Sequence, residues 1–226
     1  MATIAENLQA VRARIGRAAR AAGRDANSVT LLAVSKTHSL ARIDEARKAG
    51  QLAFGENYVR EALEKMAALP ALEWHLIGPL QSNKTRVAAE HFQWVHTLER
   101  EKIARRLAEQ RPAELPPLNV LIQVNASGET TKSGVALAEV APLAKAITAL
   151  PRLRLRGLMA IPEPGAPASR YREVRQAYER LKREFDVDTL SMGMSDDLEL
   201  AVAEGATLVR VGTAIFGARR TEKHAA

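Results

Sequence analysis

The stretch Val29-Thr30-Leu31-Leu32-Ala33-Val34-Ser35-Lys36-Thr37-His38 decides between two folds for this chain. Its apolar run, 29–34, predicts a buried strand that ends in a lysine rather than in a turn residue. An open doubly wound sheet usually follows its first strand with the glycine-rich turn G-x-G-x-x-G, and no such turn follows here. The sequence therefore favours a closed barrel over the open sheet.

Outward from this stretch, apolar runs alternate with amphipathic segments. Eight runs predict strands, at 29–34, 52–54, 74–77, 94–96, 118–124, 153–161, 189–192 and 208–211. Seven segments have helical spacing, at 40–49, 58–68, 84–92, 99–109, 137–150, 169–185 and 197–203. Such alternation is typical of parallel βαβ units, so we predict one α/β domain over residues 1–226, a single (β/α)8 TIM barrel. A further helix at 4–22, followed by Gly23, would stand outside the eightfold count.

Composition narrows the class of protein. The chain has 226 residues and no cysteine, which excludes disulfides and thiolate zinc sites, and its histidines show no metal-ligand spacing. No apolar stretch approaches the roughly 18 residues of a membrane span, and no signal peptide is apparent, so we expect a soluble, cytoplasmic protein. The net charge is +7, but arginines are interleaved with glutamates and aromatics make up only 4%. This pattern argues against nucleic-acid binding and suits the attraction of an anionic ligand such as a phosphate ester.

Lys36 places a primary amine at the mouth of the predicted barrel. A lysine that loses water there should have a lowered pKa and an accessible neutral, nucleophilic form. Such lysines form Schiff bases with carbonyl compounds, pyridoxal phosphate among them. The alternative is a strand-end lysine that lays its stem along the sheet and performs no chemistry.

The segments after the last two predicted strands resemble a phosphate site in their chemistry. Barrels often bind phosphate with the loops after strands seven and eight and a short helix. Ser191, Ser195 and Thr213 offer hydroxyls there, and Gly212 permits close approach of the backbone. Ser195 could instead only cap the helix that follows it.

Three further strand-end residues are candidates with simpler alternatives. Arg210 must find a partner if it is buried, either a carboxylate such as Glu204 or a ligand acceptor such as a pyridine nitrogen. Asn57 lines the mouth or only caps the next helix. His75 is a ligand contact or, more commonly for a lone histidine, a satisfied core residue.

Six motifs in order along the chain resemble one known family, the pyridoxal phosphate homeostasis proteins. They are Ala33-Val34-Ser35-Lys36-Thr37, Phe54-Gly55-Glu56-Asn57-Tyr58, Trp74-His75-Leu76-Ile77-Gly78-Pro79-Leu80-Gln81-Ser82-Asn83-Lys84, Leu158-Met159-Ala160-Ile161-Pro162, Leu190-Ser191-Met192-Gly193-Met194-Ser195-Asp196-Asp197 and Val209-Arg210-Val211-Gly212-Thr213-Ala214-Ile215-Phe216-Gly217. The resemblance implies a barrel like the N-terminal domain of alanine racemases.

The resemblance also implies roles for single residues. Lys36 would carry pyridoxal 5′-phosphate (PLP) as an internal aldimine. Gly212 and Thr213, with Ser191 or Ser195, would hold the phosphate. Arg210 would face the pyridine nitrogen. The remaining ring-pocket residues would be Asn57, His75 and Met159.

A family resemblance of this kind implies a carrier of vitamin B6 cofactor that affects amino-acid balance, not an enzyme with turnover. A cation at Arg210 would leave the pyridine nitrogen unprotonated and weaken carbanion stabilisation. A racemase also needs a second base, which alanine racemases take from a tyrosine on a further domain, and only 218–226 follow the last motif here. The alternatives are a PLP-dependent racemase-like enzyme and a phosphate-ester barrel enzyme that uses Lys36 without the cofactor.

Partners follow from the same reading. We expect transient contact with PLP-dependent apoenzymes, no membrane or nucleic-acid partner, and a monomer. Thr131-Lys132-Ser133-Gly134 also resembles a family segment, and Lys132 is either a second amine that helps to pass on the cofactor or a solvated loop lysine.

Overall fold

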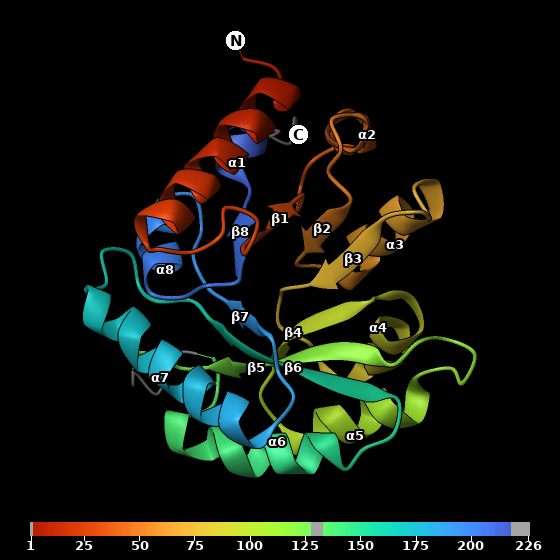
Figure 1. The fold of residues 1–226 in the computed structure, drawn as a ribbon. Coiled ribbons are helices and arrows are strands. Elements are labelled where there is room, and N and C mark those ends of the chain that lie inside the picture. The colour runs from red at the N-terminus through yellow and green to blue at the C-terminus, as the bar shows by residue number, and fades with distance from the viewer. Residues whose placement is uncertain (1, 128–132, 218–226) are drawn as a thin grey trace, which may run out of the picture.

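A computed structural model describes residues 2–127 and 133–217, and within them eight parallel strands close into a barrel. The strands are β1 (Thr30–Val34), β2 (Ala53–Glu56), β3 (Glu73–Leu76), β4 (Trp94–Leu98), β5 (Leu118–Val124), β6 (Leu153–Ala160), β7 (Thr189–Ser191) and β8 (Leu208–Val211). Each pairs with the next in sequence, and β1 pairs with β8, with Thr30 opposite Leu208. The prediction of a (β/α)8 barrel is confirmed (Figure 1).

Helices surround the barrel. They are α1 (Ile4–Ala21), α2 (Leu40–Lys48), α3 (Val59–Ala68), α4 (Thr85–His91), α5 (Glu101–Gln110), α6 (Val140–Thr148), α7 (Ala168–Glu184), α8 (Leu198–Ala203) and α9 (Thr213–Phe216), with short 3-10 turns at Ser82–Lys84 and Leu137–Glu139. All helices expected from the sequence are present, within a few residues of their predicted bounds. The four-residue α9 was not predicted. None of these described helices is long and apolar enough to cross a bilayer.

Helix α1 is the extra helix expected before the first strand. Thr3 begins it with a capping box, since its hydroxyl accepts from Glu6 N at 3.2 Å while the Glu6 carboxylate accepts from Thr3 N at 2.7 Å. Its buried face, with Leu8 and Ile15 among others, packs beside α2, α8 and α9. In Figure 1, α1 lies along the β8 side of the barrel next to α8. Helix α1 thus joins the outer ring beside α8 and α9.

The barrel interior is filled by side chains. Trp94, Leu121 and Met159, from three adjacent strands, form a buried cluster separate from the core between sheet and helices. Gly157 on β6 has φ of 144°, and a Cβ there would lie 1.9 Å from the carbonyl oxygen of Thr189 on the neighbouring strand β7, so only glycine fits at this position. A packed interior leaves the loops at the carboxyl ends of the strands as the place for a site.

Candidate functional site

A cavity of about 250 Å³ opens at the carboxyl ends of β1, β2 and β8. Six of the predicted site residues line it: Lys36, Asn57, Ser195, Arg210, Gly212 and Thr213. Val34, His38, Ile77, Ile161, Met194, Asp196 and Gly217 complete the wall. We call this space the lysine cavity. It brings one amine, one guanidinium and several hydroxyl and backbone donors together.

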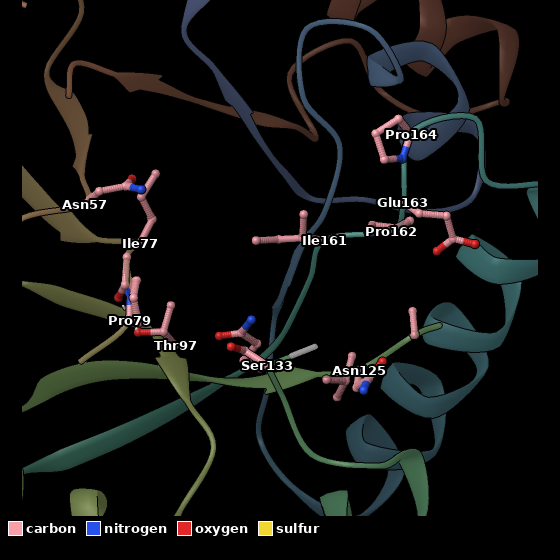
Figure 2. Close-up of a pocket in the computed structure, with 14 residues that line it drawn as sticks. Asn57, Ile77, Pro79, Thr97, Asn125, Ser133, Ile161, Pro162, Glu163 and Pro164 are labelled. Carbon is pink, nitrogen blue, oxygen red and sulfur yellow. Dashed lines mark hydrogen bonds between the residues drawn. The ribbon is translucent and has the colours of Figure 1, made fainter. Parts of the chain in front are cut away.

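A second cavity of about 390 Å³ adjoins the first and shares Asn57, Ile77 and Ile161 with it. Figure 2 shows Asn57 and Ile77 on one side of this space and Ile161 across from them, with Ser133 and Asn125 below. Three of its polar side chains, Asn57, Gln123 and Asn125, are amides. We call it the amide cavity, and the shared residues place it beside the lysine cavity at the same end of the barrel.

The backbone around Lys36 is sharply bent. Ser35 is buried, Lys36 is partly buried, and Thr37 has φ of 65°, an unusual conformation for a β-branched residue. The backbone N–H of Thr37 donates to Glu61 Oε1 at 2.6 Å. This contact fixes the strained turn directly after the lysine.

A buried ion cluster on the outer side of β1 and β2 supports the same turn. The Lys65 ammonium donates to Glu56 Oε1 at 2.7 Å, to Glu61 Oε1 at 2.6 Å and to the Ser35 carbonyl at 2.8 Å. The Ser35 hydroxyl also donates to Glu56 Oε1, at 2.6 Å. Burial raises the pKa of Glu56, and the Lys65 charge opposes that rise. We call Lys65, Glu56 and Glu61 the lysine clamp.

The residues predicted to hold a phosphate lie after β7 and β8, where Ser195, Gly212 and Thr213 line the lysine cavity. Gly212 is the residue before α9, and a Cβ on it would lie 3.2 Å from the Val34 carbonyl oxygen, so the backbone passes close to β1 here. The following residue, Thr213, also lines the cavity. Because Gly212 has no side chain, its backbone lines the cavity directly.

The loop after β7 is held in place by contacts on both sides. Asp197 accepts hydrogen bonds from Met194 N at 2.5 Å and from the Tyr171 hydroxyl at 2.6 Å. Arg14 on α1 donates to the Ser195 carbonyl oxygen at 3.0 Å. The residue before α8 is Asp197, so Ser195 does not occupy the capping position, and its alternative role as a cap is wrong.

Arg210 is 4% exposed and forms its hydrogen bonds with neutral groups. Its Nη1 donates to Ser191 Oγ at 2.7 Å, and its Nη2 donates to the Ala160 carbonyl at 2.9 Å. Burial lowers the pKa of Arg210 to about 10, which still leaves it charged at neutral pH. No carboxylate in 2–127 or 133–217 forms an ion pair with it. The Glu204 alternative is wrong, because Glu204 pairs with Arg172 at 2.8 Å and lies 3.9 Å from Arg175.

Three predicted residues lie deeper than the two cavities. Ser191, His75 and Met159 are buried and are absent from the described residues that line either cavity. Ile77 and Ile161 line the cavities, and each stands two positions after a predicted site residue, His75 and Met159. These two residues therefore lie one layer deeper in the barrel. Their places do not support direct contact with a ligand ring.

His75 has two partners inside the barrel. Its Nε2 lies 2.7 Å from Glu73 Oε1, and its Nδ1 lies 2.9 Å from His96 Nε2. Burial lowers the pKa of both imidazoles, for His96 well below its ordinary value. The reading of His75 as a satisfied core histidine describes its position.

Asn57 lies at the junction of the two cavities. Helix α3 begins after Tyr58, and Asn57 therefore does not occupy its capping position. Its Oδ1 is buried without a hydrogen-bond partner among the described residues. A Cβ on Gly78 would lie 2.2 Å from the Asn57 carbonyl oxygen, so glycine at 78 is required for this arrangement. An orphaned amide oxygen on a cavity wall is what a ligand donor could satisfy.

Sequence reasoning missed several residues of this site. His38 lines the lysine cavity and stacks on Phe216 with ring centroids 4.7 Å apart. The lysine clamp and His96 were also missed, because their partners come from other strands and helices. Ile77 and Ile161 could have been found by counting two residues past each buried strand residue. Lys132 lies outside the described residues.

Comparisons with known proteins agree with this picture. A sequence profile for the alanine racemase N-terminal domain matches residues 6–220. The chain is 60% identical to a pyridoxal phosphate homeostasis protein of Pseudomonas aeruginosa over 97% of both chains. It is 56% identical to that of Escherichia coli K12, over 99% of this chain and 100% of that one.

Solved structures of similar proteins have the same barrel fold. The structure of PipY from Synechococcus elongatus with PLP bound is 38% identical, has a TM-score of 0.82 and covers 95% of this chain and 100% of PipY. Alanine racemase of Corynebacterium glutamicum shares the fold alone, at 18% identity and a TM-score of 0.68 over 93% of this chain and 61% of the racemase. From the profile and the relatives of high identity, the chain belongs to the alanine racemase N-terminal domain family and, within it, to the pyridoxal phosphate homeostasis proteins.

Proposed function

We propose that the chain binds PLP in the lysine cavity, covalently through Lys36 Nζ, and carries it as a reserve for other proteins inside the cell. The observation that carries this proposal is the convergence of Lys36, Arg210 and the Gly212–Thr213 backbone on one cavity. The amine, the cation and the phosphate-type backbone are the three kinds of group that an aldehyde, a ring nitrogen and a phosphate require. The PLP-bound PipY relative supports the choice of ligand.

Ser195, Gly212 and Thr213 suit the phosphate. They lie after strands seven and eight of the barrel, where this fold often binds phosphate. Ser195 is the serine on the cavity wall, while the hydroxyl of Ser191 is engaged with Arg210 and His96. We therefore assign the phosphate contact to Ser195 and a supporting role to Ser191.

Arg210 suits the ring nitrogen. A guanidinium can only donate hydrogen bonds, so it pairs with a pyridine nitrogen that carries no proton. When bound, PLP supplies an electrophilic aldehyde carbon and a ring that withdraws electrons most strongly when its nitrogen is protonated. Arg210 would thus keep the ring in its weaker form, and Asn57 would offer its unpaired amide oxygen to another polar group of the ligand.

Lys36 supplies the covalent contact. Its Nζ would hold the cofactor, because bound PLP would supply an aldehyde with which a lysine amine condenses. The strained turn and the lysine clamp hold the backbone at 35 and 37, so the amine projects from a fixed base. A fixed placement of the amine lowers the entropic cost of covalent binding.

A carrier fits these features better than a turnover enzyme. Arg210 would weaken the carbanion chemistry on which racemases and decarboxylases depend. The likeness to alanine racemases is a likeness of fold and brings no activity with it. An assay for racemisation of L-alanine by the PLP-loaded protein tests this: we expect no rate above that of free PLP.

Absorbance spectra test the binding proposal. With PLP added, the parent protein should develop a visible band that Lys36→Ala lacks. Lys48→Ala is a matched control, because Lys48 is an exposed lysine on α2 whose side chain is 70% accessible. Reduction with borohydride followed by peptide mass analysis should place the cofactor on the peptide that contains Lys36.

The outcomes separate the possibilities. A band that survives in Lys36→Ala would reject Lys36 as the anchor. No band in the parent would reject PLP as the ligand and leave a barrel that binds another phosphate ester. If the band is present, transfer to a PLP-dependent apoenzyme, measured as recovered activity of that enzyme, tests the carrier role, and Lys132→Ala tests whether that amine assists.

A further inference from the structure

A continuous hydrogen-bonded chain crosses the barrel interior below the lysine cavity. It runs from Arg210 Nη1 to Ser191 Oγ (2.7 Å), to His96 Nδ1 (3.2 Å), from His96 Nε2 to His75 Nδ1 (2.9 Å), and from His75 Nε2 to Glu73 Oε1 (2.7 Å). We call these five residues the interior relay. The three middle members are essentially inaccessible to water.

The two ends of the relay lie at opposite ends of the barrel. Arg210 lines the lysine cavity, at the carboxyl end of the strands. Glu73 is the first residue of β3, and 49% of its side chain is exposed at the other end. The relay thus joins a cation at the site to a carboxylate on the opposite face.

Chemistry at the two ends determines the direction of every hydrogen bond between them. A guanidinium only donates, and an ionised carboxylate only accepts. The hydrogen bond from His75 keeps the pKa of Glu73 low, and burial keeps both imidazoles neutral at neutral pH. His75 must therefore carry its proton on Nε2, and so must His96, while the Ser191 hydroxyl donates to His96 Nδ1. With both rings neutral, no other placement of the protons satisfies all four contacts.

We propose that Ser191, His96 and His75 are positioning residues that orient the Arg210 guanidinium at the lysine cavity and couple it to the distant Glu73 carboxylate. Successive donors in a medium of low dielectric polarise one another, so the anionic end strengthens each hydrogen bond up to Ser191. This matters because Arg210 has no carboxylate partner among the described residues. The direction of the relay follows from the four contacts and from the neutrality of both imidazoles, whereas its effect on PLP rests on the proposed function.

Neighbouring groups hold the relay in one arrangement. The His75 ring stacks on Trp94, with centroids 5.1 Å apart and planes within 6°. Arg156 covers the Trp94 ring at 4.6 Å. The Ala160 carbonyl fixes Arg210 through a second N–H. A ring flip at His75 would break two hydrogen bonds, so the orientation at the cavity is determined.

Nitrogen NMR of the imidazoles tests the direction without any cofactor. In the protein alone at pH 7, His75 and His96 should both appear as neutral rings protonated on Nε2. Either ring found protonated on Nδ1 alone, or on both nitrogens, would overturn the relay. This measurement does not depend on whether the protein binds PLP.

Glu73→Gln tests the coupling across the barrel. The substitution removes the charge but keeps an acceptor for His75, so the fold should persist. We expect the His96 resonances to move, although His96 does not touch Glu73, and the dissociation constant for PLP to rise roughly two- to thirtyfold. Glu114→Gln, an exposed glutamate in the loop between α5 and β5 at the same end of the barrel, should change neither.

Ser191→Ala provides a second, small substitution close to Arg210. It should weaken PLP binding and shift the visible band, since the guanidinium loses its Nη1 acceptor. Unchanged His96 resonances and unchanged PLP affinity in Glu73→Gln, or an unchanged band in Ser191→Ala, would refute the positioning role. If the parent protein binds no PLP, the proposed function fails, and the NMR result alone decides whether the relay exists.

Discussion

Replacing Lys65 by methionine would isolate the contribution of the lysine clamp. Methionine fills much of the same space but removes the ammonium. The Glu56 carboxylate, which is fully buried, would then keep only the Ser35 hydroxyl as a donor, because its Oε2 has no partner among the described residues. Glu61 is 27% accessible and could turn to water.

The expected cost follows from this difference in burial. Breaking a buried ion pair by removing one partner costs about 3–5 kcal/mol, since one charge is left uncompensated. Replacing both partners by uncharged groups of similar shape is often close to neutral. We therefore expect Lys65→Met to lower the free energy of unfolding by about 4 kcal/mol, and Lys65→Met combined with Glu56→Gln to lower it by about 1 kcal/mol.

Urea unfolding followed by circular dichroism measures both variants, with unchanged slopes as the check that the transitions remain comparable. The pH dependence adds a second test. Burial raises the pKa of Glu56, so its contribution to stability is complete below the pKa of the unfolded chain, about 4.3, and is lost as pH rises through the folded value. Without Lys65 that loss is larger, so the gap between Lys65→Met and the parent should widen from pH 4.5 to pH 8.

Two results would refute the reasoning. A cost below about 1 kcal/mol for Lys65→Met would mean that water reaches Glu56. A double variant as unstable as the single one would mean that packing, not charge, is lost. The double variant should also retain less of the covalent PLP linkage than the parent, because the Ser35 carbonyl loses the donor that holds the turn at Lys36.

Two further predictions follow from single contacts, and a third concerns the oligomeric state. Gly78→Ala should cost about 3 kcal/mol and weaken PLP binding, measured by urea unfolding and by titration, because its Cβ would collide with the Asn57 backbone. Tyr171→Phe should cost about 2 kcal/mol in the same unfolding assay, since Asp197 would lose a hydrogen bond that holds the loop of Ser195. Analytical ultracentrifugation should show a monomer, and a concentration-dependent dimer would contradict that expectation.

The fold could be predicted from the sequence because each strand is a local run of apolar residues. The runs 118–124 and 208–211 are strands with those same bounds. Helix α9 was missed since its four residues are too few for a helical period. The place of α1 could not be predicted, because it packs beside α8 and α9, which lie at the other end of the sequence.

Only the site residues at the carboxyl ends of the strands could be predicted from the sequence. The barrel rule places Lys36, Asn57 and Arg210 at one face, and they do line one cavity. The rule placed His75 too close to the mouth. Glu73, His75 and Ile77 all point into the barrel from successive inward-facing positions of β3 and the residue after it, and of these only Ile77 lines the cavity. Which groups hold each residue depends on neighbouring strands and helices, and no motif in the sequence records that.

Lys36 and Arg210 are held at the cavity in opposite ways. Lys36 is held from outside the barrel, where the clamp fixes the backbone on both sides of it and Thr37 keeps a conformation that costs about 1–2 kcal/mol for a residue other than glycine. Arg210 is held from inside, through the neutral acceptors Ser191 Oγ and the Ala160 carbonyl oxygen, and no carboxylate among the described residues forms an ion pair with it. A carboxylate beside Arg210 would satisfy the same burial but would draw the guanidinium away from a ring nitrogen. The neutral middle members of the interior relay keep the guanidinium in place at the cavity wall, as the proposed binding of a cofactor without turnover would require.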